Sequence, residues 1–274
     1  MKLKIRSLGS SSAGNCTLIW DSESAIMVDC GFSPNYIVPH LDLMSMNINF
    51  LSGVFITHTH ADHVNKSMMR LLNKHKIPVY CHYNIKRDLA SKFVTMGKGH
   101  NAGLLRSYEE EEIKLGNFTV KGFEVPHDST GGCFGYNIYK KMKSGAVKKV
   151  TIATDMGYSH ETLAEKFADS DVIVIESNHD LEMLANSGRP MLLQQRIREI
   201  GHLSNNECAD FLVNILGRSQ KLPEAVVLAH ISQQCNTGRK AMESVSTTLK
   251  SSGYEGIKVL LTYKHQANEV VCVE

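Results

Sequence analysis

The sequence predicts a mixed α/β fold in which β-sheets are covered on their outer faces by helices. The first half of the 274-residue chain is rich in strand patterns, and the second half alternates helix and strand patterns. A composition of 42% hydrophobic and 21% charged residues provides a sizeable core and excludes a disordered chain. No internal repeat and no Pro/Gly/Ser-rich linker divides the sequence, so we expect a single domain over residues 1–274.

The first half contains short apolar strands separated by turn residues. We expect strands at residues 2–8, 17–20, 25–29, 53–56, 78–81, 117–125 and 132–139. One helix is expected at residues 64–74, directly after a histidine-rich turn.

In the second half, strands at residues 148–153 and 171–176 flank a helix at 161–168. Ser204 and Glu207 have the spacing of a capping box, and apolar residues behind them recur at helical spacing, so a helix begins there. A strand at 225–229, a helix at 239–250 and strands at 259–262 and 269–273 complete the chain.

Charge and cysteine usage limit the classes of function. The net charge of +2 barely favours acidic partners, so a nucleic-acid surface would have to be a local basic patch. The seven cysteines are odd in number and never spaced CxxC, which indicates free thiols in a reducing compartment. No signal peptide or membrane span is visible, and we expect a cytoplasmic protein.

A cluster of three histidines and one aspartate carries the strongest chemical signal. His58, His60, Asp62 and His63 fall within six residues, directly after an apolar strand. A helix would spread these side chains around its circumference and a strand would point His63 away from the others, so only a turn directs all four inward. Imidazole nitrogens and a carboxylate oxygen suit Zn²⁺, Mn²⁺ or iron. We expect a metal-binding turn, with Asp62 at a capping position of the following helix. A polar surface turn is the alternative.

Three further candidate ligands also follow strands. His127, Asp155 and His230 each stand where an apolar strand stops. Strand ends are the usual place for functional groups carried on a rigid sheet. Each would be a weak signal alone, and their agreement with the histidine-rich turn is what strengthens them.

Taken in chain order, HxHxDH, His127, Asp155-x-Gly and His230 resemble the metallo-β-lactamase superfamily over nearly the whole chain. The resemblance implies an αββα sandwich, with two packed β-sheets between layers of helices and the site at one end. It also implies two divalent metal ions, Zn²⁺ or Mn²⁺. Asp29 matches the first motif of that superfamily, where the aspartate supports the metal-binding loop without binding metal.

The same resemblance assigns the metal ligands. The first metal ion would be held by His58, His60 and His127, and the second by Asp62, His63 and His230. Asp155 would bridge the two ions.

The phosphodiesterase side of the superfamily is favoured by three segments. They look like segments of the tRNA-maturing ribonuclease Z group and are Glu176-Ser-Asn, residues 201–205 and residues 228–232. The 75 residues between Asp155 and His230 leave no room for an inserted β-CASP domain, and the long flexible arm of ribonuclease Z has no counterpart.

The resemblance is closer still to a small bacterial and phage group, the WalJ (YycJ)-type exonucleases. Its specific segment is Glu176-Ser-Asn-His-Asp180 followed by Glu182-Met-Leu184. Two features depart from the pattern of this group. Its usual Ala-Ser-Gly turn is Gly-Ser-Ser here, within residues 9–15, and Cys235 stands in the stretch after His230. The resemblance implies metal-dependent 5′-to-3′ exonuclease activity, with nucleic acid, DNA in preference, as the substrate.

Phosphodiester hydrolysis requires a hydroxide at neutral pH and relief of charge on the phosphate, and two bridged metal ions supply both. We expect Asp62 to orient the water and His202, steadied by Glu176, to donate a proton or hydrogen bond to the phosphate or leaving oxygen. A structural role for His202 before a capped helix is the alternative. Asn178 and Ser232 are expected to line the site, and His179 either lines it or pins its loop.

Basic residues in two segments are candidates for phosphate-backbone contacts, with solvated helix faces as the alternative. They are Lys66, Arg70, Lys74, Lys76 and Arg87, and then Arg189, Arg196 and Arg198. Six other histidines are expected at the surface: His40, His75, His82, His100, His160 and His265.

Alternative functions also fit the sequence. They are a ribonuclease Z-like RNA-processing nuclease, a small-molecule ester or lactone hydrolase, and a metal-bound regulatory protein without turnover. The complete ligand set together with Glu176 and His202 argues against the last of these.

Overall fold

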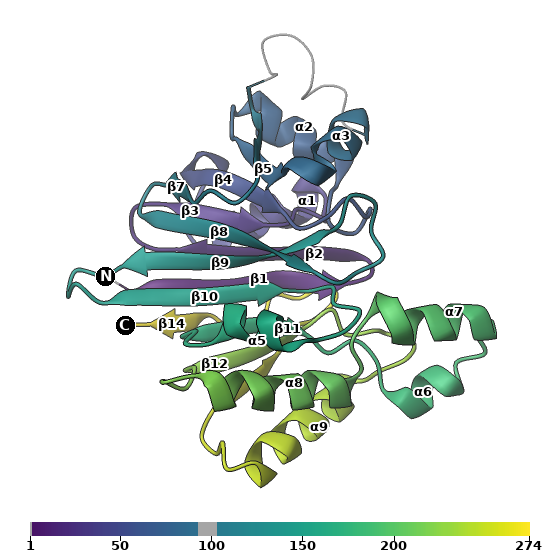
Figure 1. The fold of residues 1–274 in the computed structure, drawn as a ribbon. Coiled ribbons are helices and arrows are strands. Elements are labelled where there is room, and N and C mark those ends of the chain that lie inside the picture. Colours follow the sequence, from purple (N-terminus) through teal and green to yellow (C-terminus); the bar gives the residue numbers. More distant parts are fainter. Residues whose placement is uncertain (1, 93–102) are drawn as a thin grey trace.

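Two mixed β-sheets pack face to face between two layers of helices, as Figure 1 shows. The computed structural model describes residues 2–92 and 103–274. Each sheet has seven strands, in the orders β14-β1-β2-β3-β4-β5-β6 and β13-β12-β11-β10-β9-β8-β7. This arrangement confirms the predicted αββα sandwich. His100 lies outside the described residues.

The first sheet is antiparallel at one side and parallel at the other. β1 pairs antiparallel with β14 and β2, whereas β3, β4, β5 and β6 run parallel. Its strands are β1 (Leu3–Ser11), β2 (Gly14–Trp20), β3 (Ala25–Val28), β4 (Leu51–Ile56), β5 (Val79–His82), β6 (Leu105–Tyr108) and β14 (Val271–Val273).

The second sheet repeats this division. The meander β7-β8-β9-β10 is antiparallel, and β10, β11, β12 and β13 run parallel. Its strands are β7 (Ile113–Leu115), β8 (Phe118–Val125), β9 (Cys133–Lys141), β10 (Val147–Ala153), β11 (Val172–Glu176), β12 (Ala225–Ala229) and β13 (Lys258–Leu261).

Three apolar clusters of the described residues are packed between the layers of sheets and helices. The central cluster joins the inner faces of both sheets, including Ile26 and Phe55 of the first and Tyr136 and Ile152 of the second. A second cluster packs α1, α2 and α3 on the first sheet, and a third packs α5, α8 and α9 on the other. The helices are α1 (Pro34–Leu43), α2 (Lys66–Lys74), α3 (Tyr83–Lys92), α5 (Glu161–Phe167), α6 (Leu181–Ala185), α7 (Met191–Arg196), α8 (Asn205–Arg218) and α9 (Gly238–Ser251).

Most of the predicted elements are present. The capping box at Ser204 and Glu207 is formed at the start of α8, as predicted. Sequence patterns missed α1, α3, α6, α7, β6 and β7, the 3-10 helix η1 (Ile48–Phe50) and the π-helical turn η3 (Ile197–Gly201).

The cysteines are free thiols, as predicted, and all except Cys272 are buried. Of the helices within residues 2–92 and 103–274, none combines the length and apolar character needed to cross a lipid bilayer.

Candidate metal centre

The candidate ligands gather because strands that point the same way end at one edge of the sandwich. β10, β11 and β12 run parallel, and β8 shares their direction because it pairs antiparallel with β9. Their carboxyl ends carry His127, Asp155, Glu176 and His230. The histidine-rich turn follows β4 of the other sheet. The site therefore lies at the junction of the two sheets.

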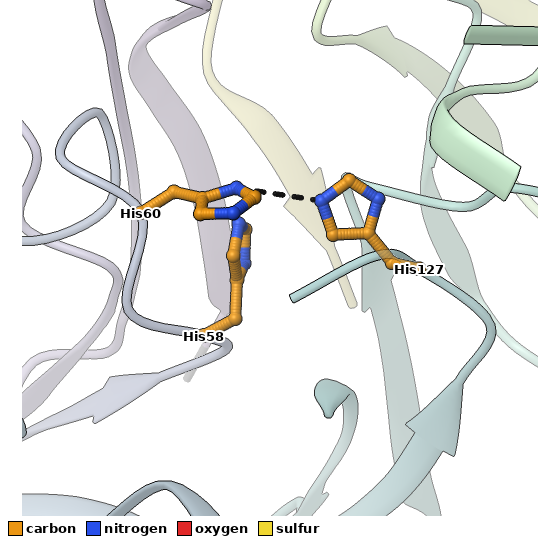
Figure 2. A group of neighbouring side chains, drawn as sticks. All are labelled: His58, His60 and His127. Atoms are coloured by element: carbon orange, nitrogen blue, oxygen red, sulfur yellow. Dashed lines mark hydrogen bonds between the residues drawn. The ribbon is translucent and has the colours of Figure 1, made fainter. Parts of the chain in front are cut away.

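Figure 2 shows His58, His60 and His127 converging from two different loops. One nitrogen of each ring lies within 4.8 Å of the others. His127 Nε2 is 3.5 Å from His60 Nδ1. Two nitrogens bound tetrahedrally to one zinc ion would lie about 3.3 Å apart, so the spacing suits a shared cation.

Asp62, His63 and His230 form a second group with the same property. Asp62 Oδ2 is 3.4 Å from Nε2 of both histidines. Asp155 lies between the two groups, 3.1 Å from His63 Nε2 and 3.9 Å from His127 Nε2. The structure thus brings together all seven residues expected to bind metal.

Three of these imidazoles are oriented by hydrogen bonds from Nδ1. His63 donates to Asp29 at 2.7 Å, His127 to the Gly201 carbonyl at 2.7 Å and His230 to Glu176 at 2.8 Å. Such bonds fix the orientation of each ring and direct its Nε2 toward a bound metal ion.

Unpaired polar atoms support the same fit. Among the described residues, His58 Nε2, His230 Nε2 and Asp155 Oδ2 are buried without a hydrogen-bond partner. Leaving such atoms unpaired is costly, and a coordinated cation satisfies them. The residues present therefore fit divalent metal binding.

The electrostatics of the site also favour bound positive charge. Burial would raise the pKa of Asp155, but neighbouring histidines, led by His230 and His63, hold it well below its usual range. Burial likewise opposes the charged form of His230, yet the carboxylates of Asp155, Asp62 and Glu176 raise its pKa to about 10. Buried carboxylates thus demand nearby cationic charge, which metal ions provide.

Glu176 connects three loops of the site. Its Oε1 accepts hydrogen bonds from Nδ1 of His202 and of His230, both at 2.8 Å. Its Oε2 accepts the backbone N–H of Met156 at 2.8 Å and of Leu203 at 3.2 Å. The His202–Glu176 pair matches the sequence expectation, whereas the bond to His230 could not be anticipated.

The turn that carries the histidines is held from beneath. Asp29 Oδ1 accepts the Thr57 N–H at 2.9 Å, and the aspartate also binds His63. Asp29 is not among the grouped metal-binding residues, in keeping with a supporting role. A Cβ atom on Gly31 would lie 1.7 Å from the Asp62 carbonyl oxygen, so only glycine permits this contact.

Two supporting residues were missed by sequence reasoning. Asn15 Nδ2 lies 3.2 Å from Asp62 Oδ2 and 2.9 Å from His63 Nε2. It lies in β2, just after the segment where the exonuclease group's usual Ala-Ser-Gly turn is Gly-Ser-Ser here, and that likeness was the available signal. Cys133 Sγ lies 3.6 Å from His58 Nδ1, and nothing in its sequence context marked it.

One structural expectation for Asp62 was wrong. α2 begins at Lys66, and its N-cap is Asn65, whose side chain accepts the N–H of Ser67 and of Met68. Asp62 instead lies in the preceding turn, which leaves its carboxylate free to face His63 and His230.

An open pocket of about 210 Å³ lies over the ligands. Asn178, Ser232 and His202 line it. His179 is outside this lining: it is fully buried, and its backbone bridges Ser204 and accepts the N–H of Asn205 at 2.8 Å. Burial lowers the pKa of its imidazole to about 4. The backbone of His179 therefore ties the loop after β11 to the start of α8.

The basic candidates are divided between the metal pocket and other parts of the surface. Arg189 and Arg196 line the pocket, whereas Arg198 lines a different hollow beside α8. Arg87 borders a third hollow on α3. Lys66, Arg70, Lys74 and Lys76 are exposed on or just after α2. Of the histidines expected at the surface, His160 and His265 are exposed, and His40, His75 and His82 are half-buried.

Comparisons with known proteins place this geometry in context. Residues 25–231 match the family described as beta-lactamase superfamily domain. The exodeoxyribonuclease YycJ of Bacillus anthracis is 29% identical over 259 residues, covering 93% of this chain and 92% of that protein. The exodeoxyribonuclease WalJ of Streptococcus pneumoniae is 29% identical over 84% of this chain and 81% of that protein. The metallo-beta-lactamase fold protein YhfI from Bacillus subtilis covers 99% of this chain and 100% of its own, with a TM-score of 0.69 at 14% identity.

Proposed function

The chain belongs to the beta-lactamase superfamily and is a metal-dependent hydrolase, and from this premise we propose that it is a DNA exonuclease. It would hold two divalent ions, Zn²⁺ or Mn²⁺, and degrade DNA in the 5′-to-3′ direction. The names of the bacterial relatives support DNA as the substrate. The observation that carries the proposal is the His202–Glu176 pair, which stands beside both ligand groups at the wall of an open pocket.

In this proposal His58, His60 and His127 hold one ion, Asp62, His63 and His230 hold the other, and Asp155 bridges them. The ions, when bound, lower the pKa of water and neutralise charge on the phosphate.

The chain's own side chains supply the remaining steps. Asp62, whose Oδ2 lies 3.4 Å from Nε2 of the pocket-lining His230, orients the attacking water through its carboxylate. His202 donates a proton from Nε2 to the leaving oxygen, because its Nδ1 is already bonded to Glu176. Glu176 is a positioning residue: its carboxylate keeps the His202 ring turned toward the pocket. Asp29 positions His63 and the turn, and Asn178 and Ser232 line the substrate-facing wall.

We further propose that residues 1–274 act as one domain. The central apolar cluster, shared by both sheets, supports this organisation, since neither sheet could bury its inner face alone.

A substrate panel tests the proposal. The purified protein, loaded with Zn²⁺ or Mn²⁺, is given 5′-phosphorylated duplex DNA, single-stranded DNA, precursor tRNA, bis(p-nitrophenyl) phosphate, and an ester and a lactone. We expect nucleotide release from DNA, beginning at the 5′ end, and loss of this activity in Asp62→Ala. Asp42→Ala, an exposed aspartate on α1, is the matched control. Turnover of precursor tRNA, the ester or the lactone in preference to DNA would refute the assignment.

A further inference from the structure

Two arginines line the pocket that lies over the candidate metal ligands. Arg189, which precedes α7, and Arg196, its last residue, both line the pocket that His60, His127 and His230 also line. In Figure 1, α7 lies at the margin of the molecule, beyond the second sheet.

Both guanidinium groups make contacts that a substrate could replace. Arg196 Nε donates to Asp128, the residue after the ligand His127, and the Arg196 side chain is 57% exposed. Arg189 Nη2 donates to Gln234 Oε1 at 2.9 Å, in an exposed contact. Contacts of this kind at the surface contribute little to stability. Replacing them with contacts to a phosphate therefore costs little free energy.

The helix that ends at Arg196 adds no residue to the apolar core. No residue of α7, every one of which the structure describes, is buried, and Met191 and Leu192 are 85% and 82% exposed. Of the acidic residues that the structure describes, Asp128 alone lines the pocket alongside the two arginines. A planar guanidinium fork binds phosphate oxygens in bidentate fashion, which favours an anionic substrate group at this wall.

The size of the pocket indicates what kind of substrate carries that group. Its volume of about 210 Å³ is below the roughly 300–1,000 Å³ of sites that enclose a small molecule. An extended backbone lying across the mouth, with one phosphate reaching the ligands, fits better than an enclosed ester or lactone.

We propose that Arg189 and Arg196 form a subsite for a second phosphate, next to the phosphodiester that is hydrolysed. The inference rests on the proposed function and specifies its substrate class, a polynucleotide strand with consecutive phosphates. Arg196 leaves Asp128 to bind this phosphate, and Arg189 leaves Gln234. The subsite makes a strand a better substrate than an isolated phosphodiester.

The test compares Arg189→Gln and Arg196→Gln with wild type on two substrates, a 5′-phosphorylated single-stranded oligonucleotide and bis(p-nitrophenyl) phosphate. Each variant is expected to lose about 10-fold in kcat/KM on the oligonucleotide, mainly through KM, because a charge-assisted hydrogen bond is removed. The loss on the single-phosphate probe is expected to be several-fold smaller. Arg239→Gln, an arginine on α9 that is 82% exposed, is the matched control and should behave as wild type.

Two further measurements separate phosphate binding from a structural role. Each variant should reduce the slope of log KM against log salt by about 0.7, the value for one contact to a single strand. Oligonucleotides with one neutral methylphosphonate linkage, placed at each of the first few positions in turn, should at one position abolish the difference between wild type and Arg196→Gln. That position identifies the bound phosphate.

The outcomes are distinguishable. Equal losses on both substrates, with an unchanged salt slope, would show that the arginines position α7 and His202, and would overturn the subsite. Wild-type kinetics in both variants would overturn it as well, and the exonuclease assignment would stand. If the wild-type protein hydrolysed bis(p-nitrophenyl) phosphate but did not act on oligonucleotides, both the proposed function and the subsite would be rejected.

Discussion

The chemistry of the site depends on single hydrogen bonds to imidazole rings. His202 is the clearest case. Among the histidines within residues 2–92 and 103–274, it alone lines the pocket without belonging to a proposed ligand triad, and Glu176 fixes its Nδ1. His202→Ala is expected to lower kcat by about 100-fold or more, the range for removal of a general acid. The measurement is kcat on DNA together with metal content by elemental analysis. Undiminished turnover with both metals retained would mean that His202 is only structural.

At the scale of residues, the sequence predicted the ligands better than their supports. Each proposed ligand follows a strand, and their order along the chain resembles that of the metallo-β-lactamase superfamily, which together selected them. Asn15 and Cys133 are ordinary residue types whose importance comes from contacts across the fold, 47 or more positions away in sequence. Local pattern cannot reveal such contacts.

At the scale of elements, the π-helical turn η3 positions two parts of the site at once. It ends at Gly201, whose carbonyl accepts the His127 hydrogen bond, and it leads directly into His202. Gly157 packs beneath it: a Cβ atom there would lie 2.3 Å from the Ile200 carbonyl oxygen. π-helical turns are frequent at functional sites, and this one shows a reason.

Gly157→Ala is therefore expected to push η3 away from β10 and lower kcat at least 10-fold, with a loss of about 1–3 kcal/mol in unfolding free energy from overpacking. Activity assays and urea unfolding measure the two effects. Gly217→Ala in α8 is the control, since the nearest atom to its Cβ would be 3.6 Å away, and alanine favours a helix. If Gly157→Ala and Gly217→Ala had the same activity, η3 would have no positioning role.

The predicted elements were those with a regular pattern. The apolar strands β10, β11 and β12 and the capped helix α8 were identified from the sequence. α7 and η3 were not, because α7 buries nothing and η3 departs from the period of 3.6. The start of α2 was placed too early because Asp62 and Asn65 are both good capping residues, and only the folded turn decides between them.

At the scale of the whole molecule, a buried ion pair connects the two sheets. Lys140 of β9 donates to Asp21, the residue after β2, and both side chains are almost completely buried. Lys140→Met would leave Asp21 charged and unpaired, so we expect a loss of about 3–5 kcal/mol in unfolding free energy. The double variant Asp21→Asn/Lys140→Met should recover part of it. Equal stability of wild type and Lys140→Met in urea would contradict this role.

The Lys140–Asp21 ion pair makes the free energy of unfolding depend on pH. Burial would raise the pKa of Asp21, but Lys140 and the N–H groups of Glu23 and Ser24 outweigh it and lower the pKa below 3.8. The carboxylate's contribution is therefore complete above its unfolded pKa and is lost as pH falls through the lower, folded value. The stability gap between wild type and Lys140→Met should narrow from neutral pH toward strongly acidic pH. A gap that is constant over this range would exclude the pair as its source.

Metal binding should also stabilise the molecule as a whole, because the ligands come from both sheets. At a concentration 100-fold above the dissociation constant, a bound ion adds about 2.7 kcal/mol. For a chain of this size, its removal corresponds to a fall of roughly 5–10 °C in Tm. Calorimetry with and without a chelator measures this, and Asp62→Ala should show a smaller difference. An unchanged Tm would argue against tightly held ions.

The backbone at the site has a consequence for how such a protein can change over time. Asp29 and His230 both have left-handed φ angles, of 60° and 54°, which cost free energy for residues other than glycine. The chain therefore has a lower free energy of unfolding than it would with relaxed backbone at these positions, and in return its proposed metal ligands are held in place. This constraint would not apply to relatives without catalytic activity. In them, glycine at either position would raise the free energy of unfolding.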